Sequence, residues 1–339
     1  MQPMRRIAVI GAGSWGTAVA SLAAQTCDTT LWARRAEVAE SITHERRNPD
    51  YLTDFEIPAR VSATGSIEKA VAGADAVVIG VPSHGFRSVL EQAVSHIGTD
   101  VPVISLTKGI EGVTLMRMTE VIADVLVGHD PDRIGVLSGP NLAKEIMAGQ
   151  PAATVIALGD HHAAQGLQQA FMTPTFRVYT NPDVIGCEIA GACKNVMAIA
   201  SGMVSGLRFG DNTRAALVTR ALAELARLGV AVGGHPLTFG GLAGVGDLIA
   251  TCYSSQSRNY TVGYGLGAGR PLDEIIAEMS MVAEGVKSTK GVLALAARHS
   301  IEMPIATEVG RVLYEGADPA DSMMTLMGRA ATSEGHGLV

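Results

Sequence analysis

The sequence feature that most constrains the fold is a glycine motif near the N-terminus. Residues 6–11 form a short apolar run rich in β-branched side chains, which predicts a buried strand. The run leads directly into Gly11-Ala-Gly13-Ser-Trp-Gly16, which opens an expected helix. In this context Gly11 permits a tight turn, Gly13 lets the backbone approach a pyrophosphate, and Gly16 allows close helix–strand packing. The motif therefore predicts a dinucleotide site at a helix N-terminus, and a glycine turn without a ligand is the alternative.

Strand and helix patterns alternate through the first half of the chain. Strands are expected at residues 6–11, 29–33, 74–83, 101–106, 134–137 and 153–158, with helices beginning near residues 12, 85 and 115. Such alternation is typical of an α/β Rossmann-type domain with a doubly wound, mostly parallel sheet. Beyond residue 182 the strand signals stop, and helices rich in small residues follow. We therefore expect a dinucleotide-binding domain at residues 1–181 and an all-α substrate-binding domain at residues 182–339.

Composition excludes several classes of protein. Hydrophobic residues make up 47% of the 339 residues and charged residues 17%, so the chain can bury a sizeable core. The net charge of −7 argues against nucleic-acid binding, although a local cluster of donors could still hold a small anion. The longest apolar run, residues 185–207, carries Glu188, Lys194 and Asn195, which would be costly in lipid, so no membrane insertion is expected.

The cysteines and histidines show no pattern of a disulfide framework or a metal site. Four cysteines occur, and the closest pair, Cys187 and Cys193, lacks CxxC spacing. The nine histidines contain no HExxH motif. We expect a reducing, cytoplasmic location and no metal.

Two arginines follow the second expected strand. An NAD-selective site usually places an acid about 20 residues beyond the glycine motif, where it binds the ribose 2′-hydroxyl. Arg34 and Arg35 stand in that position, and Glu37 comes two residues later. Because guanidinium groups match a 2′-phosphate, the pattern favours NADP over NAD; a solvated turn is the alternative.

Lys194 lies in an expected helix of small and apolar residues. None of the residues three or four positions away is a carboxylate, so a salt bridge within the helix is not available. An ammonium group in such surroundings is neutralised by a distant group or has a lowered pKa. Either state suits acid–base chemistry at a carbonyl. A lysine that reaches the surface from an amphipathic helix is the alternative.

Other candidates are weaker when taken singly. Lys108 follows the carboxyl end of a strand, where open α/β sheets bind ligands, but it could be a plain loop lysine. Asp247 follows a glycine-rich segment and could be a helix N-cap. Residues 256–259 gather amide, hydroxyl and guanidinium donors suited to phosphate, although a solvated helix start would look the same. Residues 138–141 end a strand and could line the same cleft.

Taken together, these segments resemble the bacterial NAD(P)-dependent glycerol-3-phosphate dehydrogenase over nearly the whole chain. The resemblance rests on residues 11–16, 105–109, 137–140, 191–195, 210–212, 241–247, 256–259 and 282–285. It implies the reversible NAD(P)H-dependent reduction of dihydroxyacetone phosphate to sn-glycerol 3-phosphate, which supplies glycerophospholipid synthesis. The small-residue helices could pack within one subunit or across a homodimer.

The resemblance also implies roles for individual residues. Lys194 would be the proton donor and acceptor and would contact the substrate. The dinucleotide would contact Ser14, Trp15, Arg34, Arg35, Tyr51, Lys108, Ala143, Arg258, Val282 and Glu284 in addition to the motif glycines. The substrate site would include Lys108, Gly139, Asn141, Asp247, Ser257, Arg258 and Asn259. Asn141 departs from the family pattern, where serine or threonine is common, yet it can still donate a hydrogen bond.

Two other functions compete with this interpretation. A beta-hydroxyacid dehydrogenase, which acts on a carboxylate, would also pair a dinucleotide domain with a helical domain and use a lysine–asparagine helix. Residues 256–259 and their glycine-rich lead-in favour the phosphate substrate. A non-catalytic NADPH-binding sensor would not need Lys108, Lys194 and Asp247 together.

Overall fold

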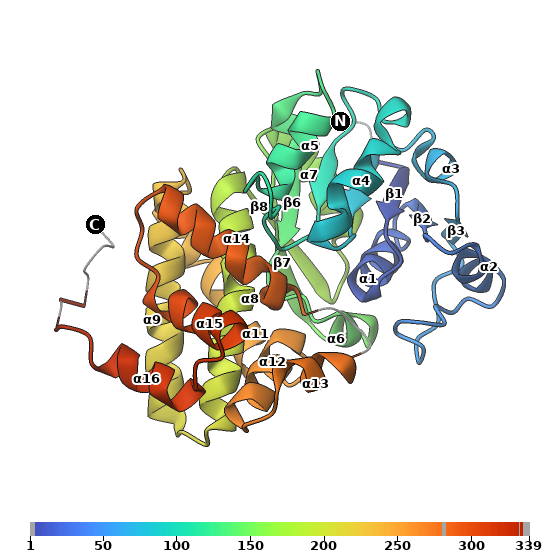
Figure 1. The fold of residues 1–339 in the computed structure, drawn as a ribbon. Coiled ribbons are helices and arrows are strands. Elements are labelled where there is room, and N and C mark those ends of the chain that lie inside the picture. Colours follow the sequence, from blue (N-terminus) through green and yellow to red (C-terminus); the bar gives the residue numbers. More distant parts are fainter. Residues whose placement is uncertain (1–3, 280–282, 332, 335–339) are drawn as a thin grey trace. The chain divides into compact units, whose positions relative to one another are not determined.

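The computed structural model describes residues 4–279, 283–331, 333 and 334. The chain divides into two compact units, which are described separately here (Figure 1). The first comprises Met1–Thr107 and Met116–Val184, and the second comprises Lys108–Leu115 and Ile185–Val339. The short segment Lys108–Leu115 therefore belongs to the second unit although the chain on both sides of it belongs to the first.

The first unit is built on an eight-stranded sheet with the order β3-β2-β1-β4-β5-β6-β7-β8. Its strands are β1 (Arg6–Ile10), β2 (Asp28–Trp32), β3 (Val61–Thr64), β4 (Ala76–Ile79), β5 (Val103–Ser105), β6 (Ile134–Ser138), β7 (Ala152–Ala157) and β8 (Phe176–Asn181). Strands β1 to β6 are parallel; β7 runs antiparallel to β6, and β8 runs parallel to β7. This confirms the expected mostly parallel α/β sheet. Strands β3 and β8 were not expected, because each is short and carries few apolar side chains.

Helices cover both faces of this sheet. Alternate residues of β1 enter different cores: Ile7 and Val9 pack on one face, and Ala8 and Ile10 pack on the other. The first face is covered by α1 (Ser14–Ala23), α2 (Ala36–His44), α6 (Ala143–Met147) and α7 (His161–Phe171). The second is covered by α3 (Ile67–Val71), α4 (Phe86–Glu91) and α5 (Met118–Val125), with short helical turns at Ser83–Gly85, Val94–His96 and Pro131–Arg133.

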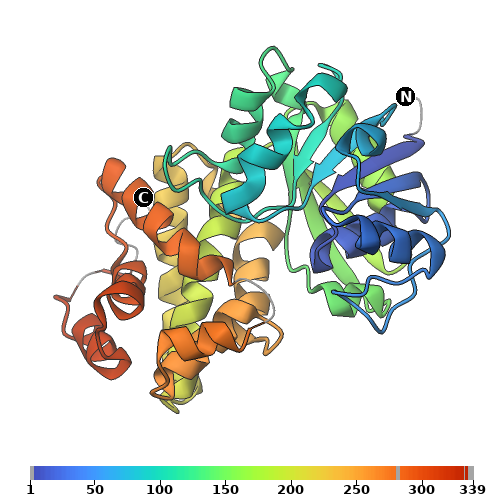
Figure 2. The ribbon, with the colours of Figure 1, turned by 45° about the vertical axis from the view of Figure 1, so that its right-hand side comes forward.

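The second unit contains only helices among its described residues, which confirms the expected all-α domain. Its helices are α8 (Val184–Gly206), α9 (Asp211–Ala231), α10 (Pro236–Phe239), the π-helical turn η4 (Leu242–Gly246), α11 (Asp247–Tyr253), α12 (Arg258–Gly267), α13 (Leu272–Ala277), α14 (Glu284–Arg298), α15 (Pro304–Glu315) and α16 (Pro319–Met327). Helix α8 runs through the middle of this unit with α9 alongside it (Figures 1 and 2). By length and composition α8 could cross a membrane, but 89% of its apolar window is buried inside the fold, as expected for the core helix of a soluble protein.

Helices α8 and α12 approach each other closely through glycines. A Cβ atom added at Gly202 of α8 would lie 2.1 Å from the Tyr260 carbonyl oxygen. A Cβ atom at Gly263 of α12 would lie 1.9 Å from the Ile199 carbonyl oxygen. The two backbones therefore touch, and any larger side chain at either position would force the helices apart. This contact fixes the start of α12 against α8.

Candidate active site

The turn between β1 and α1 has the geometry expected of a pyrophosphate cradle. Gly11 has φ +118°, and a Cβ atom there would lie 2.6 Å from the Gly80 carbonyl oxygen. A Cβ atom at Gly16 would lie 1.9 Å from the Gly11 carbonyl oxygen, so only glycine fits both positions. Gly13 is different, because nothing lies within 4 Å of its added Cβ atom. As the N-cap of α1 it supplies no side-chain cap, and open space remains where an anion can approach the backbone.

Ser14 and Trp15 begin α1 beside this turn, and both are partly exposed. The indole Nε1 of Trp15 is buried and has no hydrogen-bond partner among the described residues. An indole N–H is a donor that usually finds a partner when buried. The first turn of α1 thus combines uncapped backbone donors with an unused side-chain donor, and the residues fit a bound dinucleotide.

Arg34 and Arg35 lie just beyond β2, on the same edge of the sheet as the glycine turn, because β1 and β2 are adjacent and parallel. Arg34 is exposed and has no ion pair among the described residues. Arg35 is also exposed but already pairs with Asp50 and, at 3.6 Å, with Glu37. Tyr51 follows Asp50 in a loop and is partly exposed. Of the two arginines, Arg34 is the one whose guanidinium is available to a phosphate.

The residues after β6 form a second part of the first unit's candidate site. Gly139 has φ +137°, and Ala143 begins α6. The amide nitrogen of Asn141 donates to Thr154 Oγ1 at 3.1 Å, whereas its Oδ1 is buried without a partner among the described residues. The sequence suggested that Asn141 would serve as a donor. In the structure the unsatisfied atom of this side chain is instead an acceptor, which suits a substrate hydroxyl.

In the second unit Lys194 is buried against a carboxylate from a distant segment. The Lys194 ammonium donates to Asp247 Oδ1 at 2.6 Å and to Thr251 Oγ1 at 2.6 Å. Lys194 is 7% exposed and Asp247 only 1%. Burial, aided by the nearby Lys108, lowers the pKa of Lys194 to about 8, although the attraction of Asp247 acts in the opposite direction. Lys194 is therefore both paired at long range and shifted towards neutral pH, so the surface-lysine alternative is wrong.

Lys108 completes this centre from the segment Lys108–Leu115. Its Nζ donates to Asp247 Oδ2 at 2.6 Å, and its side chain is 17% exposed. Asp247 therefore bridges two ammonium groups with one carboxylate, which leaves the centre one positive charge in excess. Such a centre favours an anion or an oxygen that gains negative charge during a reaction.

Asp247 reaches the lysines because of the glycine-rich segment before it. A Cβ atom at Gly244 would lie 2.1 Å from the Phe239 carbonyl oxygen, so the chain there packs backbone to backbone. The segment forms the π-helical turn η4, a rare element that is frequent at functional sites. Asp247 is the first residue of α11 and its carboxylate accepts from the lysines, whereas the N-cap of that helix is Gly246.

Residues 257–259 begin α12 and serve different purposes in the structure. Ser257 is the N-cap, and its hydroxyl accepts from the Tyr260 N–H at 3.3 Å. Arg258 is exposed, whereas Asn259 is 7% exposed and donates to Asn195 Oδ1 at 2.9 Å. Glu284, the first residue of α14, is partly exposed. Val282 lies outside the described residues.

Sequence reasoning did not assign a role to Thr251 or Asn195. Thr251 lies one helical turn after Asp247, and its hydroxyl both accepts from Lys194 and donates to the Asp247 carbonyl oxygen at 2.7 Å. This four-residue spacing on α11 was a usable signal. Asn195 donates to the Lys108 carbonyl oxygen at 3.2 Å, and only its place beside Lys194 hinted at that contact.

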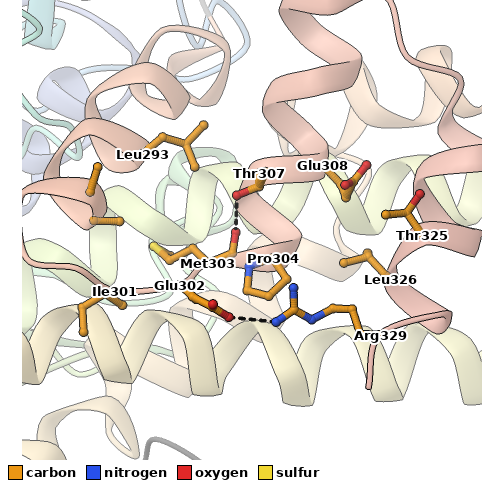
Figure 3. Close-up of a pocket in the computed structure, with 12 residues that line it drawn as sticks. Leu293, Ile301, Glu302, Met303, Pro304, Thr307, Glu308, Thr325, Leu326 and Arg329 are labelled. Atoms are coloured by element: carbon orange, nitrogen blue, oxygen red, sulfur yellow. Dashed lines mark hydrogen bonds and ion pairs between the residues drawn. The ribbon is translucent and has the colours of Figure 1, made fainter. Parts of the chain in front are cut away.

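Two cavities of the second unit lie apart from these residues. One of about 510 Å³ is lined by α14, α15 and α16, and the ion pair between Glu302 and Arg329, at 2.9 Å, lies at its edge (Figure 3). A larger one of about 970 Å³ is lined by α9, α15 and α16. None of the predicted site residues lines either cavity.

A glycine cradle on a parallel sheet and a buried lysine–aspartate centre in a helical unit together define the class, which is that of the dinucleotide-dependent oxidoreductases. The family models for the N-terminus and the C-terminus of NAD-dependent glycerol-3-phosphate dehydrogenase match residues 6–164 and 183–324. The chain belongs to this family.

Individual relatives agree with this assignment. A glycerol-3-phosphate dehydrogenase of Sphingopyxis alaskensis is 53% identical over 98% of both chains, and one of Nocardia farcinica is 52% identical over 98% of this chain and 100% of its own. The crystal structure of glycerol-3-phosphate dehydrogenase from Coxiella burnetii is 36% identical, with a TM-score of 0.91 over 96% of this chain and 99% of its own. These matches favour the phosphate substrate over the carboxylate and sensor alternatives.

Proposed function

We propose that this protein catalyses the reversible reduction of dihydroxyacetone phosphate to sn-glycerol 3-phosphate. The observation that carries the proposal is the buried Lys194 ammonium, held on Asp247 in a chain of this family. When bound, NAD(P)H supplies the hydride. Lys194 then stabilises the oxygen that becomes an alkoxide and gives it a proton; in the reverse direction the neutral amine removes that proton. With a pKa of about 8, Lys194 is mostly protonated at neutral pH and can exist in either state nearby.

The other residues bind and orient. Lys108 adds positive potential beside Lys194 through their shared carboxylate, and it contacts both substrate and cofactor in this proposal. The exposed Arg258 guanidinium is suited to a phosphate. Further substrate contacts are assigned to Gly139, Asn141, Asp247 and Ser257, and dinucleotide contacts to Ser14, Trp15, Tyr51, Ala143, Val282 and Glu284. Residues 1–181 would thus bind the dinucleotide and residues 182–339 the substrate, with Lys108 reaching the lysine centre.

A direct assay tests the reaction. Protein is mixed with NADPH and dihydroxyacetone phosphate, and the nicotinamide absorbance is followed. Loss of absorbance with this substrate supports the proposal. Turnover only with a 3-oxo or 3-hydroxy carboxylate would identify a beta-hydroxyacid dehydrogenase, and NADPH binding without turnover of either would identify a sensor.

NADP is the preferred cofactor in this proposal, and the exposed Arg34, which has no ion pair among the described residues, supports that choice. Arg34→Ala should raise the KM for NADPH about tenfold and leave the KM for NADH within twofold, because only the 2′-phosphate loses a charged partner. Arg60→Ala, which removes an exposed arginine paired with Asp28, is the matched control and should change neither KM. Equal losses with both cofactors would refute the assignment.

The protein is soluble, and a cytoplasmic location is supported by four buried free cysteines. A homodimer is supported by the exposed apolar side chains of Phe209, Met324 and Met327, which gather at the larger cavity. Sedimentation of the wild-type protein and of the double variant Met324→Glu/Met327→Glu distinguishes the two states. We expect a dimer that the double variant dissociates.

A further inference from the structure

Two buried asparagine side chains link the segments that carry the candidate site. Asn259 Oδ1 accepts from the Gly285 N–H at 2.9 Å, and Asn259 Nδ2 donates to Asn195 Oδ1 at 2.9 Å. Asn195 Nδ2 in turn donates to the Lys108 carbonyl oxygen at 3.2 Å. The chain of hydrogen bonds therefore runs from the start of α14 through α12 and α8 to Lys108.

The direction of this chain is fixed by its two backbone ends. Gly285 can only donate through its N–H, and Lys108 can only accept through its carbonyl oxygen. Each asparagine must therefore accept on one side and donate on the other, which an amide does and a carboxylate or a hydroxyl of fixed orientation does not. Asn195 and Asn259 are 5% and 7% exposed, so breaking a link would leave a buried polar group without a partner.

Close packing leaves these groups little freedom to move. A Cβ atom at Gly285 would lie 2.6 Å from the Asn195 carbonyl oxygen and 2.8 Å from Asn259 Oδ1. The glycine contacts between α8 and α12 hold the same two helices together further along. Each end of the chain also adjoins a predicted ligand contact: Lys108 itself at one end, and Glu284 next to Gly285 at the other.

We propose that Asn195 and Asn259 act as a pair of positioning residues, which hold Lys108 and the first turn of α14 in place relative to Lys194. Asn259 acts through Asn195 and does not bind the substrate phosphate with its side chain, in contrast to what the family resemblance implies. This inference rests on the proposed dehydrogenase function.

A double-mutant cycle tests the pairing. Asn195→Ala, Asn259→Ala and the double variant are compared in kcat with saturating NADPH and dihydroxyacetone phosphate. Each single variant should lose about 100-fold in kcat, and the double variant should lose about the same, because either change breaks the one chain. Ser201→Ala is the matched control, since it removes a buried hydrogen bond from α8 to the Cys252 carbonyl oxygen; its kcat should stay within about twofold.

The pH profile supplies a readout that a merely structural role would not move. If the chain holds Lys108 at Asp247, its loss leaves Asp247 to Lys194 alone and removes a repelling charge. The fall of the reduction rate at alkaline pH should then shift to higher pH in both single variants and not in Ser201→Ala. If the alanine variants fail to fold, Asn195→Ser and Asn259→Ser take their place.

Multiplying losses in the double variant, or an Asn259→Ala loss confined to the KM for dihydroxyacetone phosphate, would overturn the pairing. An unshifted alkaline fall would overturn the hold on Lys108. Failure of the proposed function is distinguishable, because the wild-type protein would then not reduce dihydroxyacetone phosphate at all.

Discussion

The two units prepare for chemistry in different ways. The first unit makes its candidate site from backbone: Gly11, Gly13 and Gly16 shape one turn, and a helix N-terminus supplies the donors. The second unit makes its candidate site from buried charge: Lys108 and Lys194 share Asp247. The first kind of site needs only neighbouring residues, whereas the second needs three segments that the fold must bring together. Local sequence therefore defines the first site, and tertiary packing defines the second.

The sharpest test of this comparison is the removal of the buried ammonium. Lys194→Ala should reduce kcat about 10³- to 10⁴-fold, because the developing alkoxide loses its proton source and its charge partner. The Kd for NADPH, measured by fluorescence titration, should stay within about threefold, since the dinucleotide contacts proposed for the first unit are intact. Lys290→Ala is the matched control, because that lysine of α14 is exposed and lies over the Tyr314 ring.

The pH dependence of the wild-type protein belongs with this test. The lowered pKa of Lys194, about 8, means that its protonated form is present below that pH and is lost above it. The rate of ketone reduction should therefore fall as pH rises through about 8, and the rate of alcohol oxidation should rise over the same range. A reduction rate that is flat from pH 6 to 10 would contradict the role of Lys194 as acid.

This contrast explains what the sequence predicted and what it did not. The order of strands, the change to helices and the glycine turn follow from local patterns in residues 6–16 and beyond. The burial of Lys194 was open from sequence, because its partner Asp247 lies 53 residues away. The membership of Lys108–Leu115 in the helical unit, and the chain through Asn195 and Asn259, depend on tertiary packing and left no local pattern.

A pair of glycine variants tests the backbone side of the comparison. Gly13→Ala should weaken NADPH binding about 10- to 100-fold and leave Tm unchanged, because the added methyl group enters open space where the pyrophosphate would approach. Gly16→Ala should cost about 1–3 kcal/mol in the free energy of unfolding, because its methyl group would lie 1.9 Å from the Gly11 carbonyl oxygen. Unchanged NADPH affinity in a folded Gly13→Ala protein would mean that this turn is only structural.

The smallest expected effect on activity concerns a second buried charge of the helical unit, Glu224 of α9. Its carboxylate accepts from the Ile305 N–H at 2.7 Å and the Ala306 N–H at 3.3 Å, at the start of α15. Burial raises the pKa of Glu224 from 4.5 to about 7, and these two hydrogen bonds oppose the rise only in part. Glu224 lies among none of the predicted site residues, so the comparison assigns it to stability alone.

Because the folded state of Glu224 holds its proton more tightly than the unfolded state, its contribution to stability is complete below pH 4.5 and is lost as pH rises to about 7. The loss is on the order of 3 kcal/mol for a shift of this size. Glu224→Gln should remove that part of the pH dependence in urea unfolding followed at pH 5 and pH 8, with kcat within about twofold. Glu278→Gln, an exposed glutamate paired with Arg270, should retain the wild-type dependence. If Glu224→Gln also lost activity, buried charge outside the lysine centre would contribute to the reaction, and the division between the two kinds of site would be too simple.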